Sequence, residues 1–176
     1  RSIIAPEGYT LIDADSAQIE ARVLAWLADQ DDLTKAFTNG EDVYVKMASR
    51  IYDKAEEDIT KDERFVGKTT ILGAGYGMGA LKFQSQLKTF GSDMHIEEAR
   101  RVIGIYRETN WKINKLWRDA QQILVSLHRN DMPFSLGRGR VLRTVPEENA
   151  IRLPSGLLMR YEDLDYDQGE KGIEFH

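Results

Sequence analysis

The 176-residue sequence contains no cysteine, which excludes disulfides and thiolate metal sites and suits a reducing cytoplasm. It is 41% hydrophobic, enough to fill a core, yet no apolar run approaches the ~20 residues of a membrane span, so we expect a soluble protein with no membrane partner. Its formal net charge of −5 at pH 7 usually argues against a protein that binds a phosphate backbone, although local basic patches rather than net charge carry out such binding.

Residues 9–22, YTLIDADSAQIEAR, change from a strand pattern to a helix pattern. The first four of them are mostly good strand formers, and from Ile19 onward apolar residues recur every four positions. Asp15 therefore falls where the predicted strand ends, on a rigid element with its carboxylate free at the edge of a sheet. Such a carboxylate suits a hard cation such as Mg²⁺.

A purely structural role for Asp15 is the alternative. An aspartate before an amphipathic helix is far more often an N-cap than a metal ligand. Gln18, three residues later, also fits the reciprocal partner in a capping box. Taken alone, this segment favours the cap.

The middle of the chain, residues 33–129, shows helical periodicity with short breaks. One break falls at the Asn-Gly pair 39–40 and another at the glycine-rich segment 73–79. Thr60 and Glu63 form a capping box that opens the helix leading to the second break. A further helix is predicted over 80–90 and ends at Gly91. The next one begins at its cap, Ser92 or Asp93, and runs to about residue 106, and a third covers 111–129.

From Pro133 onward the sequence becomes rich in β-formers punctuated by glycine and proline. The predicted order is a strand and a helix, then a long helical segment, then strands again. This order indicates an α+β fold in which helices project from a sheet. We predict three parts with no flexible linker between them: residues 1–32, 33–130 and 131–176.

A second candidate site lies on the helix that follows Thr60. Its candidate residues are spaced four apart: Arg64, Lys68, Leu72 and Tyr76. Each step of four residues rotates the side chain by only ~40° around the helix axis, so all four share one broad face. The two cations suit phosphates, and the leucine and tyrosine could flank a base or sugar, which makes a nucleotide platform. The commoner meaning of such spacing is a solvated basic edge beside an apolar stripe.

Together the two segments resemble the family A DNA polymerases. DSAQIEAR at 15–22 resembles their first palm motif, usually DYSQIELR, and RFVGKTTILGAGYG at 64–77 resembles their fingers-helix motif, RxxxKxxxFGxxYG. Segments 106–117 and 152–161 are similar to phage versions of the family. The resemblance implies the fingers and part of the palm of a DNA-templated DNA polymerase, of viral source and working in the host cytoplasm.

The resemblance assigns the metal and sugar positions of the first motif. It makes Asp15 the catalytic palm carboxylate and Ser16, which replaces the usual tyrosine, the residue whose carbonyl completes the metal shell. Two Mg²⁺ ions are implied for the complete enzyme. Glu20 corresponds to a steric gate that would select deoxynucleotides by a clash with a ribose 2′-OH.

The remaining nucleotide positions follow in the same way. Arg64 and Lys68 match the phosphate-binding cations, with Lys68 counted as catalytic. Gln18 and Arg22 match polar positions near the sugar and the primer end. Tyr44 falls where relatives often carry a phosphate-contacting histidine.

Two further assignments concern the nucleotide sugar and the DNA. Leu72 replaces an aromatic residue that packs against the incoming sugar, and it therefore has no phenolic hydroxyl. Tyr76 is retained and stacks near the templating position. We also expect DNA contacts from Arg138 and Arg140. Lys82, Lys88 and Arg143 are further basic residues that could contact DNA.

The family's third motif, a His-Asp-Glu turn with the second catalytic aspartate, does not occur in the sequence. We therefore expect a piece of a longer or split polymerase that is inactive alone. Its expected partners are DNA primer-template, dNTP and the missing palm and thumb segments, in the same or another chain. The rival interpretations are a non-catalytic nucleotide or nucleic-acid binding module, and a helical interaction protein whose 64–76 face docks a partner.

Overall fold

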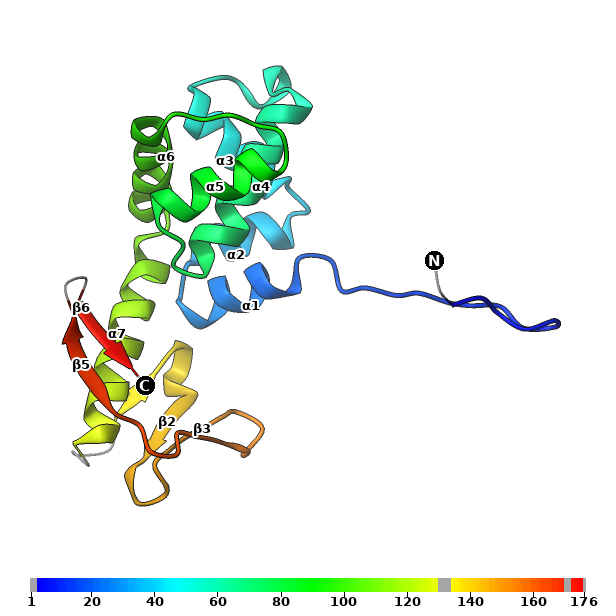
Figure 1. Cartoon of the computed structure of the whole chain (residues 1–176). Helices are drawn as coiled ribbons and strands as arrows, with labels where there is room; N and C mark the ends of the chain where they lie inside the picture. Colours follow the sequence, from blue (N-terminus) through cyan, green and yellow to red (C-terminus); the bar gives the residue numbers. More distant parts are fainter. Residues whose placement is uncertain (1–2, 130–133, 170–171, 176) are drawn as a thin grey trace.

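The computed structural model describes residues 3–129, 134–169 and 172–175, and Figure 1 shows their arrangement. The described residues confirm the predicted α+β class, with helices followed by short strands. The helices are α1 Ile19–Leu27, α2 Asp31–Thr38, α3 Val43–Tyr52, α4 Lys61–Gly75, α5 Ala80–Thr89, α6 Ile96–Thr109 and α7 Trp111–His128. Among the described residues, no helix is both long and apolar enough to cross a membrane.

Two apolar cores form among the described residues. Helices α1 to α6 enclose the larger one, and α4 packs against α1, α3, α5 and α6 within it. Phe83, Leu87 and Ile51 are among its fully buried side chains. Helices α3 and α4 approach closely at Gly67, where an added Cβ would lie 2.2 Å from the backbone oxygen of Tyr44. The absence of a side chain at this position therefore sets the distance between α3 and α4.

Side-chain caps mark the start of three of the described helices, α3, α4 and α6. The predicted capping box at α4 is confirmed, because the Thr60 hydroxyl accepts from the Glu63 N–H at 3.2 Å and Glu63 accepts from the Thr60 N–H at 2.9 Å. The predicted cap of α6 is wrong, since His95 occupies that position. Ser92 instead donates its N–H to Leu87 at 3.0 Å and so still belongs to the turn that ends α5.

A second core lies between α7 and a four-stranded antiparallel sheet in the order β1-β2-β3-β4. Gly137, with φ of +81°, brings the sheet to the end of α1, and an added Cβ there would lie 2.4 Å from Leu27 Cδ1. A separate hairpin pairs β5 with β6. The strands are β1 Ser135–Leu136, β2 Leu142–Val145, β3 Ala150–Arg152, β4 Leu158–Arg160, β5 Tyr166–Gly169 and β6 Gly172–Phe175.

The predicted strand at residues 9–12 is not formed. Residues 3–14 run as an arm away from the helices in Figure 1, and Tyr9 and Ile12 are 76% and 83% exposed. A strand takes its hydrogen bonds and its burial from a neighbouring strand, and none of the described strands pairs with this segment.

Asp15 is not the N-cap of α1, so the structural alternative for this residue is wrong. The helix begins at Ile19, and Gln18 occupies the cap position in a left-handed conformation with φ of 59° and no side-chain cap bond. The turn before the helix separates Asp15 from its first N–H groups. Its carboxylate is left exposed.

Candidate nucleotide site

The two sequence motifs meet at an open hollow of about 550 Å³ between the start of α1 and the outer face of α4. Seven of the predicted site residues line it, although they come from segments far apart in the sequence. The full lining is Asp15, Ser16, Ala17, Gln18, Ile19, Glu20, Tyr44, Lys68 and Leu72.

Helix α4 presents Lys68 and Leu72 to this hollow one turn apart, as the spacing predicted. Arg64 and Tyr76, which the spacing placed on the same face, do not line it, and Tyr76 lies just past the end of the helix. Lys68 is exposed and forms no ion pair with any described residue, so its ammonium is available to a ligand. Leu72 is half-buried beside it. Thr70 and Ile71 turn the opposite way and are buried, which fixes the orientation of the helix.

Arg64 lies one turn before Lys68 and is held by α3. Its Nε donates to Asp42 Oδ2 at 2.8 Å, and its guanidinium lies 5.3 Å from the ring centre of the buried Tyr44. Asp42 Oδ1 accepts from the N–H groups of Tyr44 and Val45, at 3.0 and 3.1 Å. Burial opposes the charged form, but the bonds from Arg64 and from these N–H groups hold the pKa of Asp42 below its usual value.

The role of Asp42 was not predicted from the sequence, although an aspartate directly before a helix pattern is a recognisable N-cap signal. Its two carboxylate oxygens do different things, since one caps α3 and the other orients Arg64. The position of Arg64 therefore depends on where α3 begins.

The far end of α4 connects back to α1. Partial desolvation, followed by hydrogen bonding to the Glu20 carboxylate, raises the pKa of Tyr76. Trp117 of α7 also fixes this end, because its indole Nε1–H donates to the Gly75 carbonyl at 2.7 Å. That contact was not predicted from the sequence.

The predicted DNA-binding arginines lie outside the hollow. Arg22 donates to the Ala17 carbonyl at 3.0 Å and stacks 4.8 Å from the Phe37 ring centre, so it stabilises the turn into α1. Arg138 forms ion pairs with Asp29, at 2.6 Å, and with Asp31. Arg140 is exposed.

The predicted metal ligands lie at the rim of the hollow. Asp15 and Ser16 are both exposed, and the Ser16 carbonyl also accepts from the Ile19 N–H at 3.2 Å. A carboxylate and a carbonyl are oxygen donors of the kind Mg²⁺ prefers, and they fit part of its shell. Within the part of the chain that the structure describes, no group of three or more histidine or acidic side chains is placed to hold a metal.

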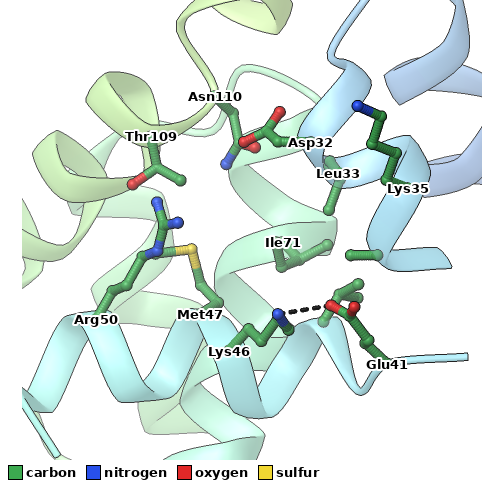
Figure 2. A pocket seen from close by; sticks show the side chains of 12 residues that line it. Asp32, Leu33, Lys35, Glu41, Lys46, Met47, Arg50, Ile71, Thr109 and Asn110 are labelled. Carbon is green, nitrogen blue, oxygen red and sulfur yellow. Dashed lines mark ion pairs between the residues drawn. The ribbon is translucent and has the colours of Figure 1, made fainter. Parts of the chain in front are cut away.

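A second hollow, of about 290 Å³, lies between α2, α3, α4 and the junction of α6 with α7, as Figure 2 shows. Acidic and basic side chains face each other around it, and Lys46 forms an ion pair with Glu41 at 2.5 Å. None of the predicted site residues lines this hollow. The candidate site is therefore the hollow between α1 and α4.

Residues 1–153 match the family model described as DNA polymerase family A. The chain is 28% identical over 182 residues to the DNA polymerase of Bacillus phage SP02, covering 99% of this chain and 28% of that protein. It is 36% identical over 162 residues to DNA polymerase I of Deinococcus radiodurans, covering 88% of this chain and 16% of that protein.

A solved structure with a similar fold is the polymerase domain of Pol1 from M. smegmatis in complex with DNA primer-template and dNTP. The TM-score is 0.51 at 30% identity, and the match covers 69% of this chain and 20% of that one. The chain thus spans 28% or less of the length of each of these three relatives.

Proposed function

The chain belongs to DNA polymerase family A, and we propose that it forms the fingers and part of the palm of a DNA-templated DNA polymerase. In this function a nucleotide is transferred from dNTP to a primer 3′-OH. One observation carries the proposal: the segment with Asp15 and the helix with Lys68 line a single hollow. The complex of the M. smegmatis relative with DNA primer-template and dNTP supports the same ligands here.

The triphosphate is bound by Lys68 and Arg64. Lys68 supplies a point charge, and Arg64 has a guanidinium whose terminal nitrogens make no hydrogen bond with any described residue. Asp42 restrains Arg64 through Nε and leaves those nitrogens for the phosphates. Phosphoryl transfer depends mainly on positioning and on neutralising charge, which these two cations provide.

Asp15 and the Ser16 carbonyl would hold Mg²⁺ at the opposite side of the hollow. A pair of such ions activates the primer hydroxyl and neutralises the phosphates when bound. The second catalytic carboxylate comes from a palm segment that carries the third motif, in the same or another chain. For this reason the 176-residue chain by itself is expected to be inactive.

The sugar is selected at the α1 side. Glu20 occupies the space of a ribose 2′-OH and lies near Tyr76, whose pKa its carboxylate raises. Leu72 supplies an apolar contact for the sugar between Lys68 and Tyr76. Tyr76 is 61% exposed and so remains available to stack near the templating base.

Calorimetric titration of the chain with dNTP in the presence of Mg²⁺ tests the proposal. Lys68→Gln should weaken binding by roughly tenfold to a hundredfold, because a hydrogen bond to a charged group contributes about 1.5–3 kcal/mol. Lys61→Gln is the matched control, since Lys61 is exposed on the same helix and does not line the hollow.

Equal dNTP affinities for Lys68→Gln and the parent would refute the assignment of the hollow. A parent chain that binds no dNTP at all would favour the helical interaction protein. Binding that needs Mg²⁺ would exclude that rival, because a docking helix has no reason to require the metal.

A further inference from the structure

Two arginines face each other directly across the sheet. Arg143 of β2 and Arg152 of β3 are register partners, and both are exposed. The next pair along, Thr144 and Ile151, is buried, and Ile151 belongs to the core between α7 and the sheet. Because side chains alternate between the faces of a sheet, both arginines lie on the outer face.

This arrangement is unfavourable without an anionic partner. Side chains directly opposite in an antiparallel pair have Cβ atoms roughly 4.5–5.5 Å apart, and like charges at that distance destabilise the pair. Neither arginine forms an ion pair with an acidic residue in the described part of the chain, and Arg143 donates only to the Arg140 carbonyl, at 3.4 Å. Arg140 itself has no acidic partner there either.

The sheet is also a basic region in an acidic protein. Residues 134–160 contain five arginines and two glutamates, a net charge of +3, whereas the whole chain carries −5. Two of the five arginines are neutralised, Arg138 by Asp29 and Asp31, and Arg160 by Glu148 at 2.6 Å. The other three have no acidic partner among the residues that the structure describes.

We propose that the outer face of β2 and β3 binds the phosphate backbone of DNA through Arg143 and Arg152, with Arg140 beside them. Phosphates placed between two opposed guanidiniums would turn their repulsion into two charge-assisted contacts. This inference rests on the proposed function, but it concerns a surface separate from the nucleotide hollow, which none of the three arginines lines. Figure 1 shows β2 and β3 beside α7, beyond the helices around α4.

The test measures the anisotropy of a labelled primer-template duplex, and of a single strand of the same sequence, bound to the chain over a range of salt concentrations. Each phosphate contact adds about 0.9 to the slope of log affinity against log salt for duplex DNA and about 0.7 for a single strand. Arg143→Gln combined with Arg152→Gln should therefore lower the slope by about 1.8 on duplex or about 1.4 on a single strand. Affinity at low salt should fall at least tenfold.

A matched control removes two positive charges elsewhere. Arg100 and Lys115 are exposed on α6 and α7 and pair with Glu97 and Asp119. Arg100→Gln combined with Lys115→Gln should leave the slope within about 0.5 of the parent value. The proposal would be overturned if both double variants lost the same amount of salt slope and DNA affinity, or if the parent chain bound no DNA.

Thermal unfolding without DNA separates binding from a structural role. Arg152→Gln should raise the melting temperature by about 1–4 °C, because it removes a like-charge pair. A fall would show that the arginines stabilise the sheet itself and would contradict the proposal. The calorimetric dNTP affinity should not change in the double variant, so a failure at this surface is distinguishable from a failure at Lys68.

Discussion

Gly67→Ala should both destabilise the protein and weaken its nucleotide site. The added methyl group would lie 2.2 Å from the Tyr44 carbonyl oxygen and 3.0 Å from the Ala48 nitrogen. Both atoms belong to the backbone of α3, so no side-chain rotation can relieve the contact. Since carbon-oxygen contacts start near 3.3 Å, α3 and α4 must separate by roughly 1 Å.

The expected cost follows from two opposing effects. Overpacking a close contact typically costs 1–3 kcal/mol, and here it falls on backbone atoms, which places it at the upper end of that range. Alanine is favoured over glycine in a helix interior by about 1 kcal/mol, which offsets part of the cost. We therefore expect a net loss of about 1–2 kcal/mol and a drop in melting temperature of roughly 2–8 °C.

Gly104→Ala is the matched control, because Gly104 lies inside α6 and an added Cβ there would meet nothing within 4 Å. It gains the helix preference without the clash and should raise the melting temperature by about 2–4 °C. Thermal unfolding followed by circular dichroism measures both variants. If Gly67→Ala is as stable as Gly104→Ala, the tight α3–α4 contact is wrong.

The same variant reports on the site, because Tyr44 and Asp42 belong to α3 while Arg64 and Lys68 belong to α4. A shift of one helix against the other should weaken dNTP binding in calorimetry by several-fold or more. Unchanged affinity in a folded but destabilised Gly67→Ala protein would mean that the hollow does not bind nucleotide across the two helices.

Two predictions remain. Glu20→Ala should raise the affinity for a ribonucleotide relative to the matching deoxynucleotide by about tenfold, measured by competition. It should also lower the pKa of Tyr76 in a spectrophotometric titration. An unchanged ratio of the two nucleotide affinities would show that Glu20 is not the gate. Asp42→Asn should lower the melting temperature above about pH 5, where the carboxylate is charged in both the folded and unfolded states. Because the folded pKa is depressed, the difference from the parent should shrink as pH falls through that lowered pKa, and a difference that is constant down to acid pH would exclude the ion pair with Arg64.

The sequence by itself determined the helical part of the fold and the family. The Thr60–Glu63 box and Gly91 were readable because capping depends on residues within a few positions of each other. The face of Lys68 and Leu72 followed from helical periodicity alone. The two polymerase motifs were likewise contiguous segments, and the match to DNA polymerase family A confirms the resemblance that they carried.

Tertiary structure decided everything that depends on contacts between distant segments. The strand expected at 9–12 did not form because strands need partners that propensity does not supply. The restraint of Arg64 by Asp42 and the opposition of Arg143 to Arg152 both depend on how two elements are aligned. Such alignment comes from packing at positions like Gly67, where a single missing side chain decides how closely two helices meet, and local sequence patterns do not encode it.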